Sequence, residues 1–314
     1  MMNKKWLVIS VLFIFLGMTV FALSSCSSGI FSVEYTTDEF ELTEDFDSIL
    51  IDVDTADVEL ALSEDDACHV VVYSHEKIKY SATVDDGKLK VSFSDEREWY
   101  DYLVFRTEAT EITLYLPKAQ YESLVIGTTT GDVDVASSFT FRTAEISLTT
   151  GDVEFLASVI GLVKISTTTG DIELSDMSAA SIDIGLTTGD TSLENVVCEG
   201  DIFVDIGTGD TCFTNVTCHN LTTDGTTGRV SLVNVIADGK MTLTRTTGDV
   251  TFDRSDASEL YVDTSTGDVT GTFLTSKIFI TNTTTGKIDV PETTEGGVCK
   301  INTTTGKIII NIAE

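Results

Sequence analysis

Apolar and polar residues alternate along most of the chain, in short runs that recur every 19 or 20 residues. The runs flank a Thr-Gly step, which is followed by aspartate in most copies. Ten copies are centred on Gly131, Gly151, Gly170, Gly189, Gly209, Gly228, Gly248, Gly267, Gly286 and Gly306. A low-complexity tract formed by chance would not keep register over ten copies, so we interpret the pattern as a structural repeat.

The alternation predicts two strands in each repeat. If the glycine is position 0, positions +2 and +4 are mostly apolar, and position +3 between them is mostly polar. Positions −7 and −5 are also mostly apolar. A period of two residues is typical of a strand with one buried face. Each repeat is therefore expected to contain a strand, a turn at the Thr-Gly step, and a second strand.

Two strands in 19 or 20 residues leave no room for a crossover helix, so the repeats are expected to stack with identical columns aligned in parallel strands. The predicted fold class is all-β, a parallel β-solenoid (single-stranded β-helix) of about ten coils. With strands roughly 4.8 Å apart, such a stack would be about 50 Å long. The glycine is expected to supply a positive φ at the corner, where a β-branched residue would be strained.

Residues 41–123 are β-rich but out of register, and we expect them to form an irregular N-terminal β cap ahead of the repeats at 124–314. Residues 49–60 resemble a degenerate coil with Ala56 at the glycine position. Other predicted features of the cap are strands at 70–73, 89–93 and 112–117 and a hairpin turn at Asp85-Asp86-Gly87.

Residues 1–26 have the pattern of a lipoprotein signal peptide, with two lysines before an uncharged apolar run. Leu23-Ser24-Ser25-Cys26 resembles a lipobox, which predicts cleavage and acylation of Cys26. The alternative is an uncleaved membrane anchor, since an apolar run of this length could just span a bilayer. Whether the segment is a cleaved signal peptide or an uncleaved anchor, the rest of the protein is expected to lie outside the cytoplasmic membrane. Residues 27–40 would then be a tether.

The net charge of −32, from 51 acidic and 19 basic residues, argues against nucleic acid as a partner, because phosphate binding relies on Lys and Arg. It also disfavours electrostatic docking on anionic lipid, which leaves the acyl chains as the membrane contact. The plain interpretation of this charge is solubility, because a surface dense in carboxylates repels its own copies.

The other cysteines give no metal site. Cys198 and Cys218 share a column of small residues in adjacent coils, where buried small side chains are the plain interpretation and a disulfide is geometrically marginal. Cys299 falls in an inward column and Cys212 in an outward one. No Cys/His spacing resembles a zinc site, and no cofactor is expected.

The position after the glycine is acidic in seven copies, at Asp132, Asp152, Asp171, Asp190, Asp210, Asp249 and Asp268. One hypothesis is a carboxylate ladder that binds Ca²⁺ between coils, since hard cations prefer several oxygen ligands. The other is that each aspartate accepts a turn N–H while solvent screens the repulsion. The second is favoured, because the motif lacks the nine-residue Gly-Gly-x-Gly-x-Asp period of calcium β-rolls.

Threonines before the glycine suggest an array of hydroxyl and methyl groups like that on ice-binding solenoids. Because the run abuts the turn instead of a flat face, corner ladders of mutually hydrogen-bonded threonines are favoured. Asn195, Asn215 and Asn234, all at position +6, predict a short asparagine ladder.

Nothing in the sequence favours an enzyme. Catalytic β-helices build a cleft from long loops between coils, whereas no coil from Gly131 onward gains more than one residue. The sequence contains no nucleophile elbow, phosphate loop or metal-binding histidine cluster.

The ten Thr-Gly-Asp-type repeats, behind an irregular β segment and a lipobox, resemble the bacterial putative-adhesin family of unknown function. Residues 122–314 match best, and residues 41–121 fit the family's usual lead-in. The resemblance implies a β-solenoid on the cell envelope and brings no catalytic residues with it.

We therefore expect an extracytoplasmic lipoprotein, anchored to the bacterial cell membrane, that acts as a non-enzymatic structural or adhesin-like interaction module. One alternative is a ligand-binding rod that recognises a glycan or Ca²⁺ through its Thr or Asp ladders. Another is an accessory protein of an envelope stress-sensing system.

The end of the chain suggests a partner site. Residues 307–312 would form an open edge with four isoleucines, and end-to-end self-association or contact with another envelope protein is expected there. Lys287 and Lys307 would limit indiscriminate stacking. The alternative is that Ile308 and Ile310 point inward and the short tail folds over the rest.

Overall fold

The computed structural model describes residues 34–65, 67–97 and 109–313. They belong to one compact unit in which every regular element is a β-strand, so the all-β class is confirmed. Within these ranges no helix is long and apolar enough to cross a membrane. Cys26, the signal segment and residues 27–33 of the expected tether lie outside the described residues.

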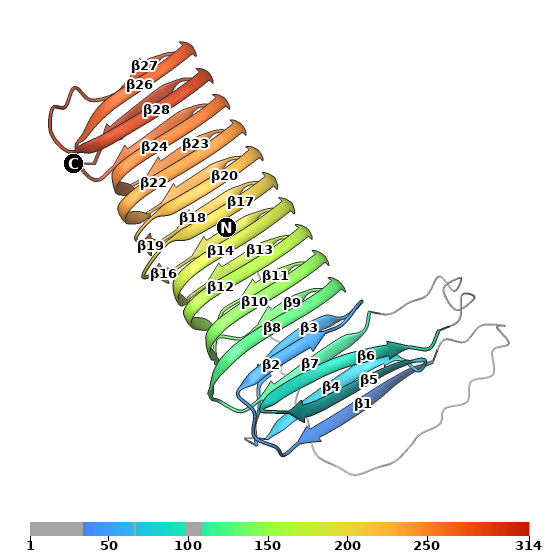
Figure 1. Ribbon diagram of the computed structural model, residues 1–314. Helices are drawn as coiled ribbons and strands as arrows, with labels where there is room; N and C mark the ends of the chain where they lie inside the picture. The colour runs from blue at the N-terminus through green and yellow to red at the C-terminus, as the bar shows by residue number, and fades with distance from the viewer. Residues whose placement is uncertain (1–33, 66, 98–108, 314) are drawn as a thin grey trace, which may run out of the picture. The chain divides into compact units, whose positions relative to one another are not determined.

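Each of the ten repeats forms two strands that meet at the Thr-Gly corner (Figure 1). The first strands are β8 (Gln120–Thr130), β10 (Thr140–Thr150), β12 (Ser158–Thr169), β14 (Ser178–Thr188), β17 (Ile202–Thr208), β20 (Leu221–Thr227), β22 (Ile236–Thr247), β24 (Asp256–Thr266), β26 (Lys277–Thr285) and β28 (Gly297–Thr305). The second strands are β9 (Val133–Val135), β11 (Val153–Phe155), β13 (Ile172–Ser175), β15 (Thr191–Glu194), β18 (Thr211–Thr214), β21 (Val230–Val233), β23 (Val250–Asp253), β25 (Val269–Phe273), β27 (Ile288–Asp289) and β29 (Ile308–Ile312). Two short strands, β16 (Val197–Cys198) and β19 (Thr217–Cys218), lie on the connections of the middle coils.

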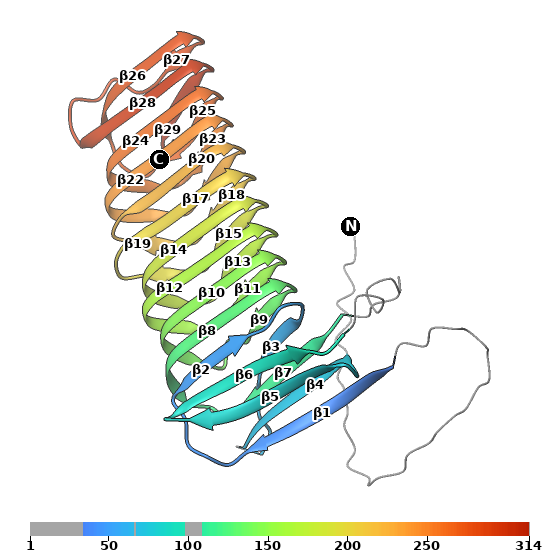
Figure 2. The ribbon, with the colours of Figure 1, turned by 45° about the vertical axis from the view of Figure 1, so that its right-hand side comes forward.

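The coils stack in register as a parallel β-solenoid, as predicted (Figure 2). In β10, Ile146 pairs with Ile126 on one side and Ile165 on the other, which are the same column of three successive coils. First strands form one sheet and second strands the other. Because every neighbour is parallel and in register, each column of the sequence becomes a row of like side chains.

The core lies between the two sheets and is built from the predicted inward columns. Side chains at positions −7, −5, +2 and +4 are buried from the Gly131 coil through the Gly248 coil. Val, Ile and Leu fill most of these places, and the β-branched residues suit the pleated surface of a strand. The Gly286 coil is the exception, since Phe279 is only half-buried and Ile288 is exposed.

The N-terminal segment closes one end of the stack. Its strands are β1 (Tyr35–Leu42), β2 (Ser48–Asp52), β3 (Asp57–Leu62), β4 (Cys68–His75), β5 (Ile78–Asp85), β6 (Lys88–Asp95) and β7 (Glu111–Leu116). Strands β2 and β3 form the predicted degenerate coil, since Ile49 pairs with Leu124 and Val58 with Val133. Strands β6 and β7 add a further parallel layer, and β1, β4 and β5 cover it in antiparallel pairing.

Two details of this segment refine the expectations. The predicted hairpin joins β5 to β6, with Asp86 and Gly87 both at positive φ. Strand β1 begins at Tyr35, inside the segment expected to be a tether, and pairs along its length with β4. Residues 35–40 therefore belong to the folded unit, because their backbone completes a sheet edge.

At the other end the order of the coils differs from the order of the sequence. The Gly306 coil (β28 and β29) inserts between the Gly267 coil (β24 and β25) and the Gly286 coil (β26 and β27). The expectation that residues 307–312 form the open edge is therefore wrong, and Lys307 is not at the end. Ile308 and Ile310 are buried and point inward, as the alternative supposed.

Composition explains the exchange. The inward residues of the Gly306 coil are apolar, whereas the Gly286 coil has Thr281 among its own. Burying the more apolar coil between two neighbours removes more apolar surface from water. The spacing of 19 or 20 residues is the same for both orders, so it could not reveal the exchange.

Candidate functional site

The corner at the Thr-Gly-Asp motif is where the repeated chemistry gathers, and its glycine is required by contact between coils. A Cβ placed on Gly189 would lie 2.1 Å from the carbonyl oxygen of Gly170. The same clash, at 1.8–2.1 Å, recurs at all ten corner glycines. Gly189 also has a φ of +138°, and eight of the ten lie in the positive range, with Gly267 and Gly286 outside it. Close approach thus accounts for glycine even where φ does not, which the sequence did not reveal.

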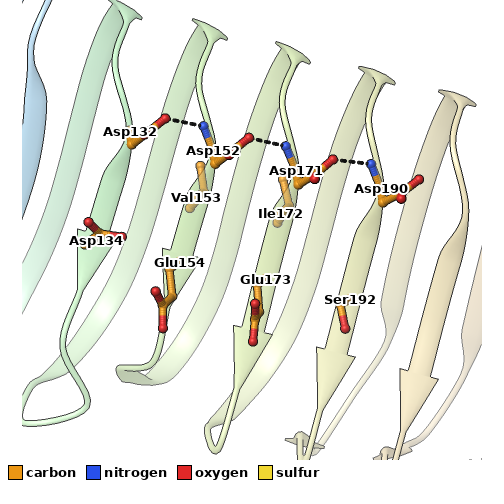
Figure 3. Close-up of a pocket in the computed structure, with 10 residues that line it drawn as sticks. All are labelled: Asp132, Asp134, Asp152, Val153, Glu154, Asp171, Ile172, Glu173, Asp190 and Ser192. Atoms are coloured by element: carbon orange, nitrogen blue, oxygen red, sulfur yellow. Dashed lines mark hydrogen bonds between the residues drawn. The ribbon is translucent and has the colours of Figure 1, made fainter. Parts of the chain in front are cut away.

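The aspartates after the glycines join adjacent coils. Asp152 N–H donates to Oδ1 of Asp132 at 2.8 Å, and Asp171 N–H donates to Oδ1 of Asp152 at 2.7 Å (Figure 3). All seven predicted aspartates accept the equivalent N–H of the next coil in the stack. The turn N–H bonds predicted from the sequence are therefore present, but the donor belongs to the neighbouring coil.

In two coils that lack the aspartate, a basic residue stands in its place and binds the aspartate of the preceding coil in the stack. Arg229 donates from its backbone N–H to Oδ1 of Asp210 at 2.8 Å and from its guanidinium to Oδ2 at 2.7 Å. Partial burial of Asp210 raises its pKa, but these donors outweigh it and the net pKa is lowered. Lys307 binds Asp268 similarly, and its backbone N–H is the main reason the pKa of Asp268 is lowered.

Beside the aspartate ladder lies a second acidic column, formed at position +3 by Asp134, Glu154 and Glu173 before Ser192 (Figure 3). The two columns line a shallow groove. Partial burial raises the pKa of Asp134 to about 6, and the nearby charge of Glu154 adds to the effect. In the part of the chain that is described, no group of three or more His, Cys, Asp or Glu is arranged to hold a metal ion. A Ca²⁺ role for the seven aspartates stays the untested alternative.

The threonines divide into inward and outward sets. At position −3, Thr167 and Thr303 are buried, and their hydroxyls donate to backbone carbonyls of Thr169 and Gly267. The predicted mutual threonine ladder is therefore wrong here, because the carbonyls of the corner are closer acceptors. At position −1, threonine is exposed in all ten coils. The exposed set forms a regular row of hydroxyl and methyl groups beside the aspartate ladder.

Asparagines at position +6 form a second ladder, directly after the end of the second strand that is away from the glycine. The side-chain amide of Asn215 donates to Oδ1 of Asn195 at 2.9 Å, and that of Asn234 donates to Oδ1 of Asn215 at 3.1 Å. Asp176 accepts from Asn195 at the start of the row. The predicted asparagine ladder is confirmed, and its members share a φ of 53–55°, a conformation that Asn and Asp tolerate well.

A buried arginine serves packing inside the coils. Arg245 is 2 % exposed and donates to the hydroxyls of Thr211 and Thr223, filling space left by Gly225. Burial lowers the pKa of Arg245 to about 10.

Cys198 and Cys218 are buried as free thiols in adjacent coils, which agrees with the plain interpretation of that column. The Cys198 thiol lies 3.6 Å from the carbonyl oxygen of Ala180. Burial raises the pKa of Cys218 to about 12, so the thiol stays protonated at neutral pH.

The repeat and its stacked corner agree with a known sequence family. The profile of the family described as Toastrack DUF4097 matches residues 46–210 and 199–314. The chain belongs to this family. The match includes the degenerate coil as well as the ten regular repeats, so the family covers nearly all of the stack.

Three solved structures are similar to this chain to different degrees. A putative adhesin from Parabacteroides merdae has a TM-score of 0.51 and 12% sequence identity, over 76% of this chain and 96% of that one. A putative adhesin from Parabacteroides distasonis has a TM-score of 0.46 and 13% identity, over 87% and 98% of the two chains. One from Bacteroides fragilis has a TM-score of 0.43 and 12% identity, over 90% and 98%. The first likeness shows a shared fold, and a comparison with curated proteins gives no match.

Proposed function

We propose that this protein is a non-enzymatic, adhesin-like interaction module held on the outer side of the cell membrane by a lipid at Cys26. The proposal rests on the structural role of the repeated motif, whose residues join neighbouring coils. Its glycines allow close approach of coils, and its aspartates bind the N–H groups of neighbouring coils. Since the motif side chains hold the stack together, function falls to the long exposed surfaces and to the ends.

The exposed surface suits contact with a large partner. Threonine at position −1 repeats on every coil, next to the carboxylates of the ladder. A regular row of hydroxyl and carboxylate groups matches an extended polymer or another protein better than a small substrate enclosed in a cleft. The likeness in fold to a structure described as a putative adhesin agrees with this use.

A lipid at Cys26 would place the solenoid close to the membrane. Strand β1 begins nine residues after Cys26. Nine extended residues reach at most about 30 Å, so the N-terminal end of the stack would stay within that distance of the bilayer. The negative charge of the chain would not add to membrane binding, so the acyl chains would supply the whole attachment.

The Cys26→Ala variant tests the anchor. Removing the thiol that carries the lipid should abolish labelling by radioactive palmitate and shift the protein from the membrane fraction to the soluble fraction. Cys212→Ala is the matched control, because Cys212 is an exposed free thiol on the stack and should label like the parent protein. A Cys26→Ala protein that still co-sediments with membranes after signal cleavage would contradict the proposed anchor.

A further inference from the structure

Strand β26 forms an unprotected edge at the C-terminal end of the stack. It is the last strand of its sheet, paired with β28 on one side, and no described strand pairs with its other side. The eight residues 278–285 read Ile-Phe-Ile-Thr-Asn-Thr-Thr-Thr, with no charge, glycine or proline. Long edges of this kind template the addition of another strand unless charge, proline or a cover prevents it.

Other edges of the same molecule carry such protection. Strand β1 has Asp38, Glu39 and Glu41, and β5 has Lys79 and Asp85. Strand β27 is two residues long, directly follows Lys287 and is separated from Pro291 by one residue. The lysine that begins β26 gives no such protection, because Lys277 is 3 % exposed and paired with the buried carboxylate of Asp256.

Apolar groups gather at this end. Ile278, Ile280 and Ile288 are 40 %, 53 % and 41 % exposed. Behind them the inward side of the last coil is incompletely covered, since Phe279 and Val290 are only half-buried against the core. At the opposite end, three antiparallel strands cover the stack. The C-terminal end thus exposes both an unpaired backbone edge and the end of the core.

Charge points to a second copy as the occupant. The chain carries −32 overall, so its acidic sides repel other copies. Residues 278–307 contain three lysines and three acidic residues, so two copies meet at this end with less repulsion than along the acidic sides. A second copy also brings a strand of the same length and an equally uncovered core end.

We propose that two copies pair through this end, with β26 of one antiparallel to β26 of the other about a two-fold axis near Thr281. This arrangement is isologous, so the β26 edges of both copies are paired with each other, and among the described strands only the protected edges of β1, β5 and β27 remain. Phe279 of each copy would lie opposite Thr283 of the other, which covers the two core ends. Ile280 would lie diagonal to Ile280 of the second copy on the outer face, within reach of a long side chain.

The inference adds a partner to the proposed function but does not depend on the lipid. Pairing can be measured on residues 33–314, because the described residues in this range form one compact unit. Failure of the Cys26 test would therefore leave it standing, and its own failure would leave the anchor standing.

Analytical ultracentrifugation of this unit, from micromolar concentration to the solubility limit, tests the proposal. The parent should be a dimer that dissociates on dilution. Ile280→Lys and Ile280→Glu should each weaken association about tenfold or more, because like charges face each other across the axis. An equimolar mixture of the two variants should regain the dimer, since opposite charges then meet.

Ile160→Lys is the control. Ile160 is 49 % exposed on β12, far down the stack from β26, and its replacement should leave the dimer intact. Unchanged thermal unfolding of the Ile280 variants would show that they fold. A parent that stays monomeric at every concentration overturns the proposal. So does a dimer that survives both Ile280 variants or is lost in Ile160→Lys.

Discussion

At the scale of single residues, two physical constraints require glycine at the corner: a positive φ and the close approach of the neighbouring coil. The sequence shows a constant glycine but does not separate the two. The period of the repeat and the constant glycine predict a turn, but they do not show that the neighbouring carbonyl lies where a Cβ would be. At Gly189 both reasons hold, since its φ is +138° and the carbonyl oxygen of Gly170 would be 2.1 Å from a Cβ. At Gly267 only the contact between coils holds.

The Gly189→Val variant should lower the free energy of unfolding by more than about 1 kcal/mol, because valine is strained at this φ and clashes with the Gly170 carbonyl. Urea titration followed by circular dichroism measures the change. Glu173→Gln, at an exposed outward position of the adjacent coil, should be nearly silent. Equal unfolding midpoints for the two variants would contradict the claim that the corner requires glycine at position 189.

At the scale of strands and ladders, most of the architecture follows from local pattern. Alternation at positions such as Ile126 and Val133 predicts which face is buried, and constant spacing predicts parallel stacking. Sequence could not give the order of the last two coils, because a coil is exchanged with its neighbour without changing any local pattern. Nor could it show that Thr167 bonds a carbonyl instead of another threonine, since both acceptors lie at the same corner.

In the outward acidic column, the ionised carboxylate of Asp134 should destabilise the folded protein, and this effect should depend on pH. The folded pKa of Asp134, about 6, is above its ordinary value of 3.8, so the folded protein holds this proton more tightly than the unfolded chain. Stability from this group is therefore present below about pH 4 and is lost as pH rises through about 6.

Asp134→Asn should consequently raise the thermal midpoint at pH 7 and change it little at pH 4. The gain should be below about 1 kcal/mol, because solvent still reaches this partly buried carboxylate and screens its charge. Asp263→Asn, at an exposed position on the other sheet, serves as the control and should give no comparable gain at pH 7. A loss of stability at pH 7 in Asp134→Asn would mean that the carboxylate is stabilising after all.

At the scale of the whole molecule, the two ends of the stack have different tasks. The N-terminal end is covered by antiparallel strands and lies close in sequence to the proposed lipid. The C-terminal end has an uncharged edge and an uncovered core. With 14 strands in one sheet, these ends are about 60 Å apart at the usual strand spacing. Two copies anchored at their N-terminal ends and paired at their C-terminal ends would link two anchoring points that are up to about two stack lengths apart.

The candidate chemistry was only partly readable from the sequence. The sequence places the seven aspartates in one column, and the register of the coils brings each of them next to the N–H of its neighbour. What decides between holding coils and holding Ca²⁺ is the direction of each Oδ1, which depends on the stacked backbone. Asp171, for example, accepts the N–H of Asp190 at 2.7 Å.

The response of the melting temperature to Ca²⁺ tests the central claim, that the Thr-Gly-Asp corner holds coils together instead of binding a ligand. The account predicts the same melting temperature for residues 33–314 in millimolar Ca²⁺ and in chelator. Asp171→Asn combined with Asp190→Asn should not change that indifference, because an asparagine oxygen still accepts the neighbouring N–H. A melting temperature that rises with Ca²⁺ concentration, as ligand linkage requires, and loses this response in the double variant would contradict the account.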